Sequence, residues 1–149
     1  MQVTTLFSPG DACGKHIRSL MREAQERLDI CVFTISDNDI ADAIKNAFDR
    51  GINVRIVTDN DKMWDEGSDI KALYEHGIEV KIDQTDYHMH HKFMVVDGHT
   101  VLTGSYNWTR SAAQFNHENI ISFTDRQVSQ KFSAEFEKLW EECVGMEDN

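Results

Sequence analysis

The alternation of apolar and polar positions divides the chain into helices and strands. Apolar residues recur at helical spacing over about residues 12–27 and again over 40–48, which predicts two amphipathic helices. Between them, the apolar run Asp29–Thr34 predicts a buried strand. Asp37 or Asn38 would cap the second helix at its start, and Gly51 would end it.

A helix that stops at glycine and leads into a short strand then occurs twice. Arg50–Val57 reads RGINVRIV and His76–Ile82 reads HGIEVKI. The second copy is preceded by a helix that carries Ile70, Leu73 and Tyr74. Strands that alternate with helices are typical of βαβ units and a parallel sheet.

The pattern changes in the second half of the chain. Lys92–Val96 and Thr100–Thr103 predict a hairpin around Asp97-Gly98, and Asn119–Phe123 predicts a further strand. Thr124 with Gln127 would form a capping box for a last helix. The inner face of that helix would carry Val128, Phe132, Phe136, Leu139 and Trp140. The whole pattern predicts an α/β fold with a mixed, largely parallel β-sheet flanked by helices on both faces.

Length and composition place this fold in one domain over residues 1–149. The sequence has neither a signal-peptide pattern nor an apolar run long enough to span a bilayer, so we expect a cytoplasmic protein without a stable membrane anchor. Cys13, Cys31 and Cys143 form no CxxC pair, and we expect buried, inert thiols rather than disulfides or a zinc knuckle.

Charge limits the class of function further. The formal net charge is −11, which argues against a protein that coats DNA, because such proteins neutralise phosphates with basic surfaces. An enzyme with a local electropositive site is still compatible with that charge. Between Tyr87 and His117 the only acidic residue is Asp97, beside Lys92, Arg110 and five histidines.

His90-x-Lys92 is the centre of this segment. Residues two apart on a strand share a face, so the imidazole and the ammonium would point the same way and grip one anion. The hairpin would bring Ser105 and Asn107 back towards them as neutral donors, and Gly104 would let a ligand approach the backbone. Glu118 could accept the proton on the second imidazole nitrogen.

The spacing H-x-K, four residues, D, six residues, G-S-x-N resembles the signature of the phospholipase D superfamily. The segments DICVFTISDNDIADAI, GINVRIVTDND and GSYNWTRSAAQFNHENI are similar to its small single-motif branch, which includes bacterial endonucleases and the mitochondrial Zucchini-type proteins. The resemblance implies a phospholipase D-like fold and the catalytic set His90, Lys92, Asp97 and Glu118. In that set His90 would form a phosphohistidine, Glu118 would orient it, and Asp97 would have a more structural role. Lys92, Ser105 and Asn107 would bind the phosphate oxygens.

The resemblance further implies a homodimer, because a single motif supplies one histidine and the leaving oxygen needs a second acid. A two-fold axis would bring two copies of the same surface together. The expected activity is that of a metal-independent phosphodiesterase with no cofactor, an endonuclease acting on single-stranded or non-specific nucleic acid. A cardiolipin-type phospholipid hydrolase is the alternative; the lack of a recognisable basic amphipathic helix favours the nuclease.

Rival interpretations use the same residues. His88 and His90 have the HxH spacing of a zinc-binding strand, with His117 or Asp97 as a third ligand, while His91 would face the other way. Tyr106 and Trp108 are predicted to pack in the interior, with base stacking as the other possibility.

Overall fold

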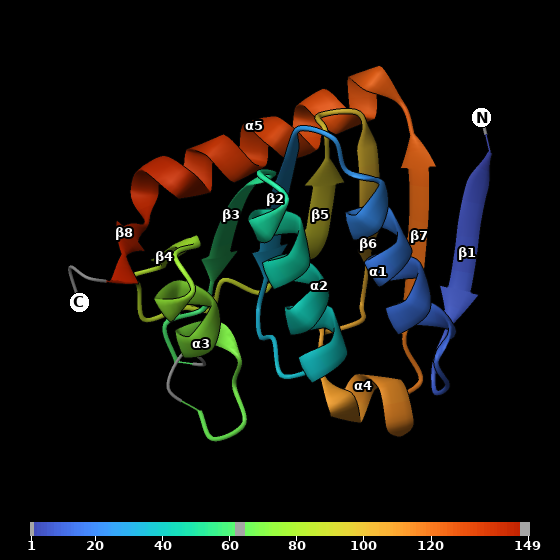
Figure 1. Cartoon of the computed structure of the whole chain (residues 1–149), viewed down its shortest axis with the longest axis horizontal. Coiled ribbons are helices and arrows are strands. Elements are labelled where there is room, and N and C mark those ends of the chain that lie inside the picture. The colour runs from blue at the N-terminus through green and yellow to red at the C-terminus, as the bar shows by residue number, and fades with distance from the viewer. Residues whose placement is uncertain (1, 62–64, 147–149) are drawn as a thin grey trace.

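An eight-stranded sheet forms the centre of the computed structural model, which describes residues 2–61 and 65–146 (Figure 1). Its strands lie in the order β1-β7-β6-β5-β2-β3-β4-β8. Their bounds are β1 Val3–Phe7, β2 Arg27–Val32, β3 Asn53–Thr58, β4 Glu79–Ile82, β5 Lys92–Val96, β6 Thr100–Gly104, β7 Asn119–Thr124 and β8 Val144–Gly145. The helices are α1 Ala12–Glu23, α2 Asn38–Asp49, α3 Ile70–Glu75, α4 Arg110–Gln114 and α5 Arg126–Glu142.

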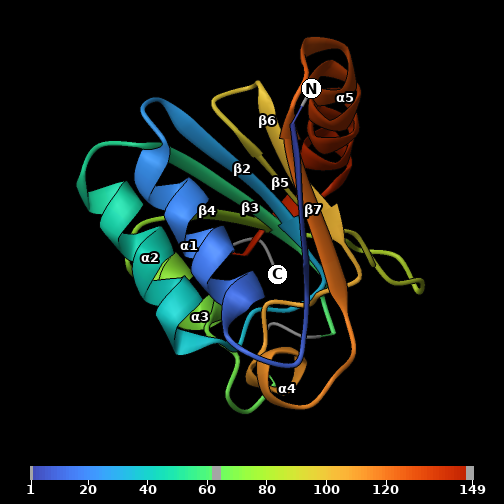
Figure 2. The ribbon, with the colours of Figure 1, turned by 90° about the vertical axis from the view of Figure 1, so that its right-hand side faces the viewer.

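Helices cover both faces of this sheet, as the sequence predicts. Figure 2 shows α1, α2 and α3 on one face and α5 on the other. The first layer is held by the larger apolar cluster, with fully buried Ile17, Ile30 and Ile44. On the other face Phe136 of α5 is fully buried against a smaller cluster that includes Phe93 and Val95.

The predicted strand directions are partly wrong. Parallel pairing joins β2 to β3 and β3 to β4, which are the strands of the repeated helix–glycine–strand unit. The other five neighbouring pairs of the described strands are antiparallel, so the sheet is mixed but not largely parallel. The short connection from β5 to β6 explains part of this, because parallel strands need a long crossover and a hairpin enforces antiparallel pairing.

Helix ends differ from the predictions at two places. α1 ends at Glu23 rather than near Arg27, because Ala24 adopts an extended conformation and Arg27 already belongs to β2. α5 is capped by Asp125, whose carboxylate accepts the N–H of Val128 at 2.9 Å, and not by a capping box on Thr124. For α2 the cap is Asp37, one of the two predicted residues.

Three short elements were absent from the prediction. β1 and β8 pair at the two edges of the sheet, and α4 lies at the end of the molecule where β5 begins (Figure 1). β1 is exposed along most of its length and β8 has two residues, so neither carries the apolar run by which a buried strand is recognised. No helix in the described part of the chain is long and apolar enough to cross a membrane.

Candidate active site

An open polar pocket lies where β5 begins and β6 ends, with a volume of about 450 Å³. The hairpin therefore brings the two halves of the motif together, as predicted. The pocket is lined by His90, His91, Lys92, Thr103, Gly104, Ser105, Asn107 and Glu118. Five of the six predicted site residues are in this set, and Asp97 is the exception.

The imidazole of His90 and the ammonium of Lys92 are in direct contact. Lys92 Nζ donates to His90 Nδ1 at 2.8 Å and to the His90 carbonyl oxygen at 2.7 Å. β5 begins only at Lys92, so His90 lies in the segment just before the strand. The predicted common orientation of the two side chains is nevertheless confirmed by their contact.

Local electrostatics favour a neutral imidazole at this position. Partial burial, the Lys92 ammonium and His88 together lower the pKa of His90 below its ordinary value. Burial also lowers the pKa of Lys92, and the negative charge of Glu118 opposes that shift. A neutral imidazole keeps a nitrogen lone pair, which a nucleophile needs.

Phe33 packs beneath both groups, which the sequence prediction missed. Its ring centroid is 4.6 Å from that of His90, and Lys92 Nζ lies 5.7 Å from it. The Phe33 N–H donates to the carbonyl oxygen of His91 at 2.9 Å, which ties the end of β2 to the segment before β5. An aromatic residue at the end of a buried strand is expected to pack in the hydrophobic core, so the sequence does not indicate that Phe33 contacts the site.

Ser105 and Asn107 lie on the other side of the pocket. The Ser105 hydroxyl accepts the backbone N–H of Asn119 at 3.1 Å, which leaves its own proton available to an anion. The side-chain oxygen of Asn107 is buried and has no hydrogen-bond partner within the described residues, but an amide oxygen can only accept. The groups that can donate to phosphate oxygens are the Ser105 hydroxyl and the amide nitrogen of Asn107.

Glu118 lies in the pocket but is not joined to the histidine as expected. Its carboxylate accepts from Asn116 Nδ2 at 3.4 Å, and its N–H donates to the Ser8 hydroxyl at 3.1 Å. Among the residues the structure describes, no hydrogen bond links Glu118 to His90. The proposed role of Glu118 in orienting the imidazole stays a prediction.

Asp97 lies outside the pocket, which corrects its place in the predicted catalytic set. Asp97 follows Lys92 by five residues along an extended strand, so the two residues are separated by roughly 16 Å. Its carboxylate accepts the backbone N–H groups of Gln25, Glu26 and Arg27, the last two at 2.8 and 2.9 Å. Although partial burial alone would raise it, these three bonds hold the pKa of Asp97 below its ordinary value. Asp97 thus ties the β5–β6 turn to the start of β2, in keeping with the structural role that the resemblance implies.

Gly104 has a structural role where β6 meets its neighbouring strand. A Cβ atom at this position would lie 2.1 Å from the Asn119 carbonyl oxygen and 2.8 Å from Ile120 Cα. The close backbone neighbour is β7, which pairs with β6 at this point. Because Gly104 also lines the pocket, the expectation that a ligand approaches this backbone stays a prediction.

His88 and His91 have carboxylate partners of their own, on different parts of the chain. His91 faces α5, where its Nε2 lies 3.0 Å from Glu135 Oε2. The ring centroids of His88 and His90 are 6.3 Å apart, and Nδ1 of His88 lies 3.3 Å from Oδ2 of Asp59 instead. Asp97 is remote, so the predicted alternative of an HxH zinc site loses one of its two possible third ligands.

The remaining interior residues agree with the sequence prediction. Tyr106 and Trp108 are buried at 1% and 0% exposure, so they pack in the core and do not offer a stacking surface. The three cysteines are buried and free. Asp59, which is fully buried at the end of β3, is the polar residue near the site that the prediction missed.

Comparison with known proteins places this geometry in context. A family model described as "Cardiolipin synthase, PLD-like domain" matches residues 17–140. The mitochondrial cardiolipin hydrolase of Xenopus tropicalis is 46% identical over 132 residues, which cover 89% of this chain and 63% of that protein. The mitochondrial cardiolipin hydrolase of Chlamydomonas reinhardtii is 45% identical over 118 residues, 79% of this chain and 53% of that protein. The chain thus spans between about half and two thirds of the length of these curated relatives.

Two solved structures share the fold over almost the whole chain. Nuc from Salmonella typhimurium, described as a phospholipase D family member, has a TM-score of 0.89 and 24% identity, and the match covers 97% of both chains. NucT from Helicobacter pylori has the same TM-score and 25% identity, with 97% of this chain and 99% of that chain covered. These matches agree with the predicted α/β fold class.

Proposed function

The chain belongs to the phospholipase D-like family, and from that premise we propose that it hydrolyses phosphodiester bonds with His90 as the nucleophile. The observation that carries the proposal is the contact between His90 and Lys92, opposite Ser105 and Asn107 in one open pocket. An imidazole whose pKa is lowered, one cation and two neutral donors are the groups that attack on a phosphodiester requires.

Lys92 would change partner when a phosphodiester enters. The phosphate oxygens carry a full negative charge, so the ammonium would turn to them from the imidazole nitrogen. Nδ1 of His90 would then be free to carry the proton that Glu118 accepts, and the other nitrogen would hold the lone pair. This exchange reconciles the observed Lys92–His90 bond with the predicted role of Glu118.

The reaction would then run in two steps. His90 forms a P–N bond while the bond from phosphorus to the leaving oxygen breaks, and that oxygen takes a proton. A water molecule gives up a proton and attacks phosphorus, the P–N bond breaks, and a phosphomonoester is released. Lys92, Ser105 and Asn107 would stabilise the charge that develops on the phosphoryl oxygens in both steps.

The proton for the leaving oxygen is proposed to come from His90 of a second copy in a homodimer. The sequence contains one H-x-K motif, and His91, the other histidine that lines the pocket, is paired with Glu135, so we infer that the acid is a histidine of another copy. We expect specific activity to fall on dilution below the dimer dissociation constant, with sedimentation measured in parallel. Full activity from a proven monomer would contradict the dimeric site.

Two substrate classes follow from different observations. The polar lining of the pocket suits the backbone of single-stranded nucleic acid, which is our main proposal for the substrate. Cardiolipin-type phospholipid is the second candidate, because the curated relatives are named mitochondrial cardiolipin hydrolases. The exposed side chains of Phe7 and Phe115, on the segments tied together by Ser8 and Glu118, could also contact acyl chains.

A parallel assay separates these candidates. Single-stranded DNA, RNA, duplex DNA and cardiolipin vesicles would be incubated with the protein in the presence of a chelator, with the His90→Asn variant as the blank. Cleavage of single strands well above the blank supports the nuclease, and release of phosphatidic acid supports the lipid hydrolase. Turnover of none of the four, or equal turnover by His90→Asn, would contradict the proposed phosphodiesterase.

A further inference from the structure

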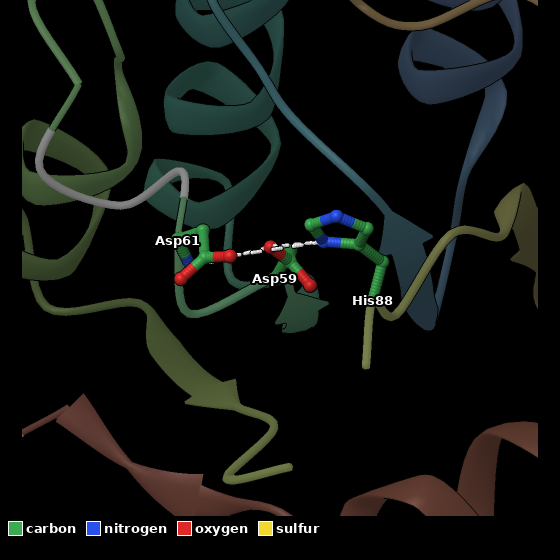
Figure 3. Close-up of side chains that lie close together, drawn as sticks. All are labelled: Asp59, Asp61 and His88. Atoms are coloured by element: carbon green, nitrogen blue, oxygen red, sulfur yellow. Dashed lines mark hydrogen bonds and ion pairs between the residues drawn. The ribbon is translucent and has the colours of Figure 1, made fainter. Parts of the chain in front are cut away.

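A second cluster of ionisable side chains lies beside the pocket. Figure 3 shows Asp59, Asp61 and His88 pointing towards one another, two from the chain that follows β3 and one from the segment before β5. One ligand atom of each lies within 4.8 Å of the others. We propose that these three residues bind a divalent transition-metal cation, with Zn²⁺ as the best fit.

Asp59 is the buried member of this cluster. Its side chain is fully buried, and Oδ1 accepts the N–H of Met89 at 2.9 Å. Oδ2 accepts the N–H of Asp61 at 3.2 Å and faces Nδ1 of His88 at 3.3 Å. A buried carboxylate is costly unless its charge is balanced, so this position favours a cation at the side of Oδ2 that faces the other two residues.

The cluster contains more acceptors than donors. Nδ1 of His88 lies 3.3 Å from Asp59 Oδ2 and 3.8 Å from Asp61 Oδ2, so one nitrogen faces two carboxylates. That nitrogen carries at most one proton and can donate it to only one of them. A cation would interact with all three groups at once, which a single proton cannot do.

The distances are suited to a small tetrahedral ion. Zn²⁺ binds imidazole nitrogen and carboxylate oxygen at about 2.0–2.2 Å, so tetrahedral ligands lie roughly 3.4 Å apart. The separations of 3.3 and 3.8 Å from His88 are close to this value. An imidazole together with two carboxylates favours zinc or a similar transition metal over Ca²⁺ and Mg²⁺, which prefer oxygen alone. Asp61 and His88 are exposed, so a water molecule can take the fourth position.

This site is separate from the proposed nucleophile. His90 is not one of the three ligands, and its ring centroid is 6.3 Å from that of His88. The cation would place positive charge beside the phosphate pocket and hold the chain after β3 to the segment before β5. The inference therefore does not rest on the proposed function, and hydrolysis that resists a chelator is compatible with it.

Metal titration of the whole chain tests the proposal. After removal of bound metal with a chelator and dialysis, Zn²⁺ binding is measured by calorimetry, and Co²⁺ binding by the visible absorption of a tetrahedral site. We expect one tight site per chain. His88→Gln and Asp61→Asn, both changes of exposed side chains, should each weaken it by at least ~10-fold and abolish the Co²⁺ absorption.

His76 supplies the matched control. Its Nε2 lies 2.8 Å from Asp49 Oδ1, so it is an imidazole beside a single carboxylate, and His76→Gln should bind Zn²⁺ as the wild type does. Absence of tight binding by the wild type would overturn the proposal. So would an affinity that His88→Gln and Asp61→Asn leave unchanged, or that His76→Gln reduces as much as they do.

Discussion

The two ends of β5 carry two parts of one motif, and they use their charges differently. At the first end, Lys92 contacts His90 and faces an open pocket with neutral donors. At the other end, the Asp97 carboxylate accepts three backbone N–H groups and closes the turn onto the start of β2. Both residues are charged. We propose that Lys92 leaves His90 to bind a phosphate, whereas the hydrogen bonds of Asp97 to backbone N–H groups belong to the folded structure itself.

The difference explains why the motif spacing alone does not define a catalytic set. The four residues between Lys92 and Asp97 are the rest of β5, so the strand fixes that interval by its length. A residue can therefore belong to the motif because it holds the strand in place. The predictions below test this division between a chemical end and a structural end.

Removal of His90, the proposed nucleophile, should give the largest effect. In His90→Ala we expect kcat/KM to fall by about 10⁴-fold or more, because the group proposed to form the covalent intermediate is lost. The side chain is exposed, so the midpoint of thermal unfolding should stay near that of the wild type. His99→Ala, an exposed histidine at the Asp97 end, is the control and should keep wild-type activity. Wild-type turnover by pure His90→Ala would disprove the assignment.

Loss of the cation at the same end should have the next largest effect. Lys92→Met keeps most of the length of the side chain but removes the charge that would stabilise the phosphoryl oxygens. We expect kcat to fall by about 10²–10³-fold, as for the loss of one transition-state donor. Steady-state kinetics with the preferred substrate measures this. A change confined to KM would mean that Lys92 binds substrate and transition state equally.

The Asp97 end should respond in stability instead of activity. Asp97→Ala leaves three N–H groups without their acceptor and places alanine at a φ of 53°, so we expect a loss of about 2–3 kcal/mol in the free energy of unfolding. Asp97→Asn keeps an acceptor oxygen and tolerates this φ, and should lose less. Denaturant titration measures both, and kcat of the folded variants should match the wild type. A loss of kcat without a loss of stability would place Asp97 in the chemistry.

Acid titration sharpens the same test. The pKa of Asp97 is lowered in the folded state, so its contribution to stability is present above the ordinary carboxyl value of 3.8 and is lost as pH falls through the folded value. The stability advantage of the wild type over Asp97→Asn should therefore shrink as the pH falls below about 4. An advantage that is constant over this range would mean that the carboxylate charge contributes nothing.

Local patterns predicted most helices and strands, but not all of their pairings. The repeated helix–glycine–strand unit correctly indicated β3 and β4 and their parallel neighbours. The direction of β5 against β2 could not be predicted in this way, because it depends on contacts between strands far apart in the sequence. Likewise β1 pairs with β7 from the other end of the chain, and its exposed residues carry no apolar pattern.

The site could be predicted as far as motif spacing and the hairpin determine it. From these two features we correctly predicted that Ser105 and Asn107 lie in the same pocket as His90 and Lys92. They could not reveal Phe33, which packs against the imidazole of His90, or the buried Asp59, which faces His88. These two residues directly follow β2 and β3, and they meet the site only through the order of the strands in the sheet. Asp97 was placed in the catalytic set because the motif contains it, although its bonds are to the backbone of a different strand.

The pH dependence of kcat/KM should show the smallest but most specific difference between the two ends. It reports ionisation in the free enzyme, where burial first, and then the charges of Lys92 and His88, lower the pKa of His90. The neutral imidazole therefore persists to lower pH, and the acid limb should lie below the ordinary value of 6.5. Lys92→Met removes one of the lowering charges, so the limb of its residual activity should move upward. Asp97→Asn lies at the far end of β5 and should leave the limb in place. The pH profiles of kcat/KM are measured with a chelator at constant ionic strength. An acid limb that shifts equally in Lys92→Met and Asp97→Asn would show that the two ends of β5 are not electrostatically separate.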